Sequence, residues 1–166
     1  MYQAGDFVVY GIHGVCRIQE IQENNVCGQK KTYYVLQPVF QDASRYMVPL
    51  ENQAAVSKLR PIATREELDR LLESQEVRTG EWIENEPLRK QRYKELIVSG
   101  DQKELLKMIG ALLREKEEKQ LAGKKLHICD ENFLRDAKKL LEGEYAVVFG
   151  VEVDKVGQYL AERLVK

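Results

Sequence analysis

Three cysteines and two histidines are the side chains that a zinc site or a Cys–His nucleophilic pair would use. They are Cys16, Cys27, Cys129, His13 and His127. No two cysteines form a CxxC pair, and an odd number argues against a disulfide framework. A zinc site would need four of these five residues to converge from distant elements. A Cys16–His13 pair could serve a small hydrolase, but packing and capping are commoner roles for such residues.

The usual sequence signatures of enzymes are also missing. The chain has no GxGxxG, no P-loop and no HExxH motif. We therefore expect no enzymatic activity, no metal and no cofactor. A hydrolase using Cys16 or Cys129 is the most distant of the function classes that the residues leave open.

Charge and hydropathy narrow the class of protein further. Among 166 residues, 26 basic and 27 acidic side chains give a net charge of −1. This balance excludes a histone-like polycation and argues against tight independent DNA binding, which depends on neutralising phosphates. No apolar run approaches the roughly 20 residues that span a bilayer. The N-terminus MYQAGDFVVY lacks the features of a secretory signal. We expect a cytoplasmic monomer with no membrane contact.

Residues 1–61 have the pattern of a small β domain. Short apolar or aromatic runs occupy 7–10, 15–21, 32–36 and 46–50, and 15–21 comes close to alternating with period two. The pairs Asn24–Asn25 and Gly28–Gln29 supply turn residues. Pro49 marks an edge strand or a strand end. Five short strands in about 60 residues, four of them at these runs, predict a small, strongly bent Tudor/SH3-like barrel.

Residues 64–166 change to helical periodicity, so the predicted fold class is α+β with an all-α C-terminal domain. Thr64 and Glu67 form a capping box for a helix that runs to about Glu76. A linker containing Gly80 and Pro87 follows at 78–87. Apolar stripes and caps then predict four further helical segments, at 88–98, 102–121, 130–147 and 151–165.

A series of short motifs carries a resemblance to a known family. GDFVVYGIHGVCRI, YYVLQP and MVPLEN lie in the β half. A Trp beside a turn, the basic helix RKQRYKELIVSGD and the segment LLEGEYAVV follow in that order. From Gly5 to about Val148 the chain resembles the CarD (CdnL) family of bacterial transcription regulators. A shorter similarity, to the polymerase-interacting module of a transcription–repair coupling factor, covers only the first 60 or so residues.

The resemblance implies a function without catalysis. The N-terminal half would dock on the β subunit of bacterial RNA polymerase, largely by strand pairing. The helical half would reach promoter DNA at the upstream edge of the transcription bubble without strong sequence readout. A Trp there acts as a wedge in the minor groove, and the lifetime of the open promoter complex changes.

The resemblance also implies which residues contact the polymerase. It places the contact on Asn24, Val26 and Met47. Relatives often have basic residues at the positions of Asn24 and Met47, and here Lys30, Lys31 and Arg45 could supply that charge instead. The alternative for Val26 and Met47 is packing inside the barrel.

The implied DNA contact centres on Trp82, the only Trp of the chain. Residue types alone favour an anchor in the core or linker for Trp82, whereas the resemblance favours the DNA wedge. Its flanking residues Glu81, Glu84 and Glu86 would repel phosphate. The basic side chains expected to face phosphates, or alternatively only solvent, are Arg89, Lys90, Arg92, Lys94 and Arg114.

Some family positions differ in the helical half. Relatives often have Arg, Lys and a capping Ser where this chain has Gly110, Glu131 and His127. We therefore expect weak DNA contact that depends on tethering by the polymerase. The alternative function is a protein–protein adaptor with no DNA role. Its Tudor-like half would bind a peptide or a β edge, and its helices would scaffold another partner.

Overall fold

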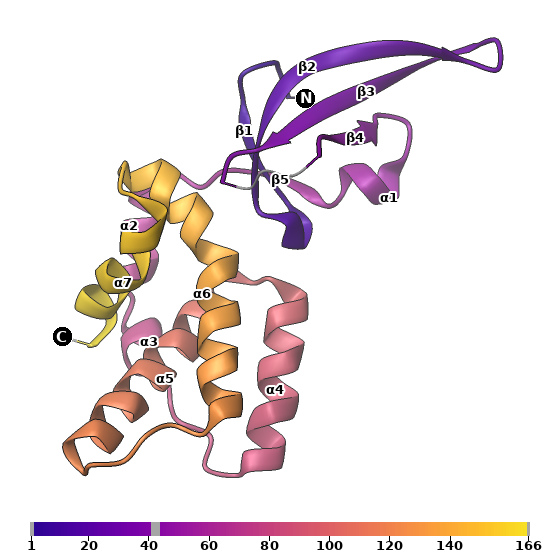
Figure 1. The fold of residues 1–166 in the computed structure, drawn as a ribbon. Coiled ribbons are helices and arrows are strands. Elements are labelled where there is room, and N and C mark those ends of the chain that lie inside the picture. The colour runs from indigo at the N-terminus through magenta and orange to yellow at the C-terminus, as the bar shows by residue number, and fades with distance from the viewer. Residues whose placement is uncertain (1, 41–43, 166) are drawn as a thin grey trace. The chain divides into compact units, whose positions relative to one another are not determined.

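The chain forms two compact units that divide between Ala63 and Thr64. A computed structural model describes residues 2–40 and 44–165 (Figure 1). The first unit is an antiparallel β-sheet and the second is helical. The predicted α+β class is confirmed. The observed division falls two residues after the end of the predicted β domain, inside the segment that links the two kinds of periodicity.

A single five-stranded sheet holds the N-terminal unit together, with strand order β4-β3-β2-β1-β5. Within the described residues every strand pairing is antiparallel, and β4 and β5 form the two edges. The one-turn helices η1 and α1 lie in the connections. The elements are β1 Phe7–Tyr10, η1 Gly11–His13, β2 Val15–Val26, β3 Gln29–Pro38, β4 Tyr46–Pro49, α1 Gln53–Val56 and β5 Leu59–Pro61.

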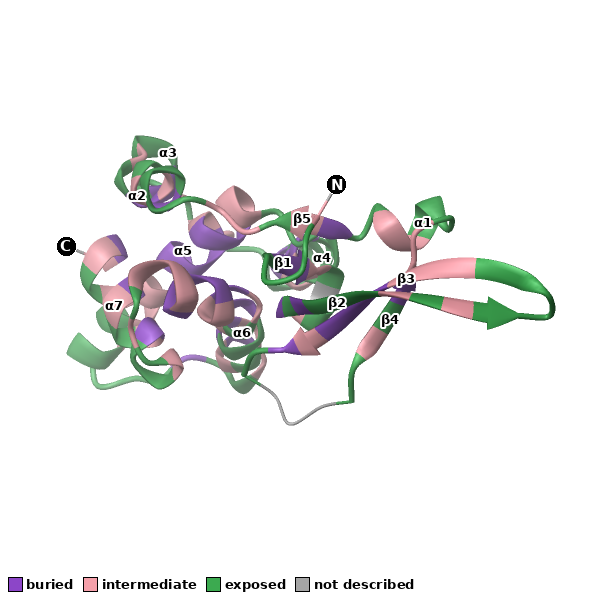
Figure 2. Ribbon diagram, turned by 90° about the horizontal axis from the view of Figure 1, so that it is seen from above, coloured by how far each residue is buried: buried purple, intermediate pink, exposed green. Residues whose placement is uncertain are grey.

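Strands β2 and β3 of the central hairpin are longer than their neighbours β1 and β4. β1 pairs only with residues 15–17 of β2, and β4 pairs only with residues 33–36 of β3. The far end of the hairpin therefore projects as a two-stranded ribbon whose residues are mostly exposed or half-buried (Figure 2). Two open strand edges of this kind are available to another chain.

The hairpin turn lies at Cys27–Gly28, where φ is 52° and 78°. Two successive positive φ values are the requirement of a type I′ turn, which matches the twist of the flanking strands. The predicted turn at Asn24–Asn25 is wrong, because both residues belong to β2 and pair with Lys31 and Lys30. Because the chain reverses at Cys27–Gly28, β2 continues through Asn24 and Asn25 without interruption.

A β-bulge at Gln19 decides which side chains of β2 face the core. Ile18 pairs with Leu36, but Glu20 pairs with Val35, so Gln19 is the extra residue. A bulge bends its strand and increases the local twist, which agrees with the strongly bent sheet expected from the sequence. The core of this unit contains Val8, Cys16, Ile18, Tyr34, Leu36, Val48 and Leu59.

The helical unit begins at the predicted capping box. The Thr64 hydroxyl accepts the Glu67 N–H at 3.1 Å, and the Glu67 carboxylate accepts the Thr64 N–H at 2.9 Å. The first helix ends earlier than predicted, because Ser74 with ψ of 132° separates α2 from the short α3. The helices are α2 Arg65–Glu73, α3 Gln75–Arg78, α4 Glu86–Ser99, α5 Gln102–Leu121, α6 Ile128–Phe149, η2 Val153–Lys155 and α7 Val156–Val165.

Helix α5 is the centre of this unit and packs against α3, α4, α6 and α7. Its bounds agree with the prediction, and α6 extends two residues beyond the prediction at each end. Asp101 caps α5 by accepting the Glu104 N–H, as predicted. The fully buried side chains include Leu68, Leu72, Leu105, Leu106, Ile109, Leu112, Leu134, Leu141, Tyr145 and Leu160. Within the described residues, no helix is both long and apolar enough to span a membrane.

We expect residues 1–63 and 64–166 to fold when each is produced alone, since each unit has its own core. A core of the smaller size supplies only about 3–5 kcal/mol of stability. Each fragment should therefore show far-ultraviolet circular dichroism typical of its strands or helices, and a cooperative urea transition. A fragment 1–63 without a cooperative transition would contradict an independent β domain.

Candidate protein and nucleic-acid interfaces

Four of the residues expected to contact the polymerase lie on one face of the sheet. Directly paired residues of antiparallel strands project to the same face. Asn24 pairs with Lys31, and Met47 pairs with Val35, which in turn pairs with Glu20. Val26 is two residues beyond Asn24 and shares its side. The face opposite the core therefore presents Asn24, Val26, Lys31 and Met47, and we call it the outer face.

The exposure of Val26 and Met47 distinguishes a partner contact from packing inside the barrel. Val26 is 43% exposed and Met47 is 46% exposed. Neither side chain packs inside the sheet, so the alternative of barrel packing is wrong for both. Lys30 is exposed as well, but it pairs with Asn25 and so projects from the opposite face of the ribbon. Of the two hairpin lysines, Lys31 is the one beside the expected contact.

The edge strand β4 offers main-chain groups next to the same residues. The Leu50 N–H donates to the Thr32 carbonyl at 3.0 Å, which sets the alternation of hydrogen bonds along β4. By that alternation Tyr46 and Val48 direct their main-chain groups toward β3, and Met47 directs its N–H and C=O outward. Pro49 has no N–H to offer. Met47 therefore supplies the outward donor of β4.

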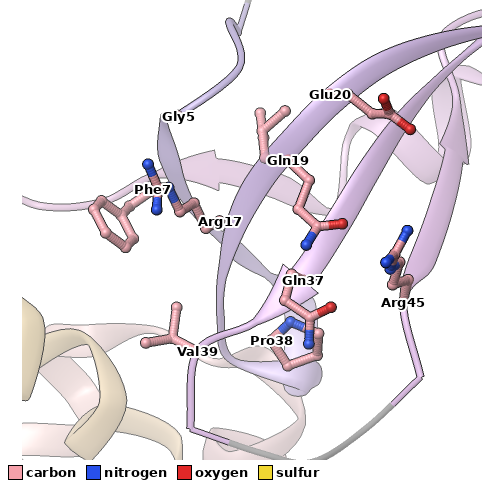
Figure 3. Close-up of a pocket in the computed structure, with 10 residues that line it drawn as sticks. Gly5, Phe7, Arg17, Gln19, Glu20, Gln37, Pro38, Val39 and Arg45 are labelled. Atoms are coloured by element: carbon pink, nitrogen blue, oxygen red, sulfur yellow. The ribbon is translucent and has the colours of Figure 1, made fainter.

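A pocket of about 760 Å³ also opens on the outer face, beside the bulge (Figure 3). A row of paired residues crosses it, since Phe7 pairs with Arg17 and Arg17 pairs with Gln37. Figure 3 shows Phe7, Arg17 and Val39 at one end and Glu20 and Arg45 at the other. Arg45, the remaining residue of the expected polymerase contact, therefore lies on the outer face. Apolar surface and two guanidinium groups meet in this pocket.

In the helical unit, Trp82 lies in the irregular segment 79–85 between α3 and α4. Its side chain is partly exposed, so it is not a member of the buried core. Its neighbours Glu81 and Ile83 line a cavity of about 210 Å³ with Tyr93 and Met108, and Trp82 does not. Instead, the indole ring stacks on the guanidinium of Arg89, with 4.4 Å between Cζ and the ring centroid.

The structure assigns Arg89 a role different from the expected phosphate contact. Arg89 is only 4% exposed, and Asp130 of α6 is fully buried beside it. The Nε and Nη2 groups of Arg89 donate to the two carboxylate oxygens of Asp130 at 3.0 and 2.9 Å. The third nitrogen, Nη1, donates to the Ile83 carbonyl at 2.9 Å. Since all three nitrogens are engaged inside the unit, Arg89 is not an exposed phosphate ligand.

Arg114 is half-buried, and two of its three nitrogens bind main-chain carbonyls of the same unit. Its Nη2 donates to the Gly80 carbonyl at 2.8 Å, and its Nη1 donates to the Leu164 carbonyl at 3.3 Å. Burial lowers the pKa of this guanidinium. The absence of a side chain at Gly110 leaves it room, because a Cβ there would lie 3.1 Å from Nη1. A Cβ at position 110 would require the Arg114 guanidinium to shift by a few tenths of an ångström.

The remaining basic residues of α4 lie on its exposed surface. Lys90 pairs with Glu86 at 3.0 Å, and Arg92 lies 3.7 Å from Glu95 and 3.6 Å from Glu104. Lys94 is exposed, and within the described part of the chain it has no carboxylate within 4 Å. These three side chains could contact phosphate, although two of them would first have to leave a carboxylate.

The cysteines and histidines do not assemble into the chemical sites considered from the sequence. The Cys16 thiol is buried and donates to the Gly14 carbonyl at 3.8 Å, and burial raises its pKa to about 11. His13 instead stacks near the rings of Tyr10 and Tyr46. Cys16 is therefore protonated at neutral pH and is a poor nucleophile. In residues 2–40 and 44–165, no three His, Cys, Asp or Glu side chains are grouped to hold a metal.

Asp130 is the residue of this site that sequence reasoning missed. It lies 41 positions from Arg89, and nothing in the pattern of either helix indicates that they meet. A buried carboxylate at the start of a helix resembles any acidic first-turn residue, which is common there because it complements the helix dipole. The only available signal was the placement of Asp130 on the side of α6 that carries Leu134 and Ala137.

Comparison with known proteins finds similarity to both units of the chain. Residues 2–62 match the family described as CarD-like/TRCF RID domain. The chain is 27% identical over 172 residues to Putative transcription factor YdeB of Bacillus subtilis (strain 168). This alignment covers 96% of the chain and 99% of the relative, and so includes the helical unit as well as the sheet. These findings confirm the resemblance to the CarD family, which the match to the CarD-like/TRCF RID domain places in residues 2–62 and the alignment with the relative extends to the helical unit.

Proposed function

We propose that this protein regulates transcription by docking on the β subunit of bacterial RNA polymerase and stabilising the open promoter complex. The observation that carries the proposal is the outer face of the CarD-like domain. It combines an open β4 edge with the exposed apolar side chains of Val26 and Met47, which lie at positions that the family resemblance implies. The basic residues Lys31 and Arg45 lie on the same face. The helical unit then presents Trp82 to DNA at the upstream edge of the bubble.

Docking by strand pairing suits a surface with little net charge. An extended partner strand beside β4 gains main-chain hydrogen bonds, and side chains on the outer face add specificity. Met47 and Val26 supply apolar contact, and Lys31 with Arg45 supplies the positive charge that relatives often carry at positions 24 and 47. Asn24 lies within this surface, and Lys30 serves a partner that wraps around the ribbon.

The DNA contact is weak by itself in this proposal. Arg89 is buried, Arg114 is half-buried and bound to main-chain carbonyls, and Lys90 and Arg92 are paired with glutamates. Trp82, Lys90, Arg92 and Lys94 therefore act on DNA that the polymerase already holds nearby. Tethering raises the effective concentration to about the mM range, so weak contacts suffice. The adaptor alternative, with helices that bind no DNA, is not favoured by the similarity to a protein named as a transcription factor.

Met47→Pro should weaken binding to the polymerase β subunit about tenfold or more. The substitution removes the outward N–H of β4 and spares the bonds to β3. A carbonyl of the partner left buried without a donor costs about 1–3 kcal/mol, and 1.4 kcal/mol is about tenfold in affinity. Binding of the full-length variant to the isolated β subunit by biolayer interferometry would measure the effect.

Met47→Ala is the matched control, because it shortens the side chain and keeps the N–H. Both variants should unfold cooperatively, as edge positions tolerate proline. If Met47→Pro is folded and binds as tightly as the wild-type protein, the β4 edge is not the docking strand. If Met47→Ala loses as much affinity as Met47→Pro, side-chain contact rather than main-chain pairing dominates.

Trp82→Ala should leave polymerase binding unchanged and shorten the lifetime of the open promoter complex. Contact between an aromatic ring and a base contributes about 1–2 kcal/mol. The complex should therefore dissociate several-fold to about tenfold faster. Competitor-challenge kinetics on a linear promoter fragment would measure the lifetime. An unchanged lifetime at saturating variant, with docking intact, would exclude Trp82 as the DNA contact.

The isolated protein should bind random duplex DNA far more weakly than specific regulators, which reach about 10⁻⁸–10⁻¹¹ M. The net charge of −1 and the internal engagement of Arg89 and Arg114 are the reasons. Fluorescence anisotropy of a labelled duplex at about 150 mM salt gives the affinity. Nanomolar binding under those conditions would show that a stronger basic surface exists elsewhere.

A further inference from the structure

Two arginines from different helices hold the segment that carries Trp82. Arg114 of α5 donates to the Gly80 carbonyl at 2.8 Å, two residues before the indole. Arg89 of α4 donates to the Ile83 carbonyl at 2.9 Å, one residue after it, with a longer contact of 3.5 Å to the Glu84 carbonyl. The segment has no helix or strand bonds of its own. Its conformation near Trp82 therefore depends on these two side chains.

Arg89 acts on both the main chain and the side chain of the segment. One edge of its guanidinium binds the Asp130 carboxylate bidentately, and the remaining nitrogen binds the Ile83 carbonyl. The Cζ of the same guanidinium lies over the indole, 4.4 Å from the ring centroid. Because Asp130 fixes the position of the guanidinium, it also fixes the cation against which the indole packs.

The buried ion pair of Arg89 and Asp130 contributes little to the stability of the fold by itself. Arg89 and Asp130 have exposed side-chain fractions of 5% and 0%, and removing two charges from water offsets much of their attraction. Apolar side chains of similar volume often serve as well or better in such places. Apolar side chains would not, however, bind a main-chain carbonyl or orient an aromatic ring. Beside Trp82 the segment borders a hollow of about 210 Å³ that is lined by Glu81 and Ile83.

We propose that Arg89 and Asp130 are positioning residues for Trp82. They hold the partly exposed indole in one orientation before DNA arrives, so that little conformational freedom is lost on contact. Arg114 secures the other end of the segment at Gly80. The part of this inference that concerns DNA rests on the proposed function, whereas the fixed orientation of Trp82 in the free protein does not.

Trp82 is the only Trp of the chain, so its fluorescence reports on its own surroundings. The main test uses the double variant Arg89→Met/Asp130→Leu in the full-length protein. This variant replaces the ion pair by apolar side chains, which avoids an unpaired buried charge. Acrylamide quenching and steady-state anisotropy of Trp82 are measured below the unfolding transition. Polymerase docking and open-complex lifetime are measured on the same samples.

The proposal expects a folded double variant with increased quenching and reduced anisotropy of Trp82. Docking affinity stays unchanged, and the open complex dissociates about two- to tenfold faster, the range that a cation–π contact of about 0.5–1.4 kcal/mol supplies. In a Trp82→Ala background the double substitution should cause no further loss of lifetime. Quenching, anisotropy and lifetime all equal to those of the wild-type protein would overturn the proposal.

If the double variant does not fold, the Arg89→Lys variant tests the same proposal. Lysine keeps a charge beside Asp130, but it lacks the planar fork that reaches both carboxylate oxygens and the Ile83 carbonyl together. The same changes in fluorescence and lifetime are expected. Wild-type fluorescence in a folded Arg89→Lys protein would contradict positioning by the guanidinium.

Arg163→Met is the matched control for a purely structural arginine. Arg163 also pairs with an aspartate of another helix, Asp69 at 3.2 Å, and also stacks on a ring, that of Tyr159. Its contacts do not include the Trp82 segment, so it should lower the unfolding temperature without changing the quenching of Trp82. If the Arg89→Met/Asp130→Leu variant shows increased quenching and reduced anisotropy of Trp82 but an unchanged open-complex lifetime, positioning is upheld and the proposed DNA role is refuted.

Discussion

The buried pair of Arg89 and Asp130 is the interaction on which the helical unit's candidate site depends. It joins the first turns of α4 and α6, which are 41 residues apart in the chain. The same guanidinium binds the segment before α4 and stacks on Trp82. A carboxylate and a guanidinium buried together must satisfy their remaining hydrogen-bonding groups nearby. The Ile83 carbonyl meets that need for Arg89, and the irregular segment gains its conformation as a result.

The β domain is organised by a different constraint, the pairing of strands of unequal length. β2 and β3 continue past β1 and β4, so their far ends have no neighbours in this sheet. The bulge at Gln19 shifts the register by one residue and keeps Ile18 in the core while Glu20 turns to the outer face. Exposed apolar side chains, two arginines and an open edge therefore share one face. The surface suits an extended protein segment better than a nucleic acid.

Much of the architecture could be predicted because it depends on neighbouring residues. The Thr64–Glu67 capping box, the Asp101 cap and the bounds of α5 follow from contacts within one or two helical turns. The break at Ser74 was missed, because it is a short interruption inside a continuing apolar pattern. Turn residues were expected both at Asn24–Asn25 and at Gly28–Gln29, and the observed turn at Cys27–Gly28 includes only Gly28. The two pairs are equally good local signals, and only the pairing of the whole hairpin chose between them.

By itself, the sequence determined the two kinds of periodicity, the change between them near Thr64, and the motifs that mark the CarD-like domain. The tertiary structure alone decided which basic residues face outward. Arg89, Lys90, Arg92 and Lys94 look alike as a charge run, yet one of them is buried and three lie on the surface. The difference arises because Asp130 and the Ile83 carbonyl reach only Arg89. Charge patterns record spacing along one helix, whereas the burial of a charge depends on partners that folding brings from elsewhere.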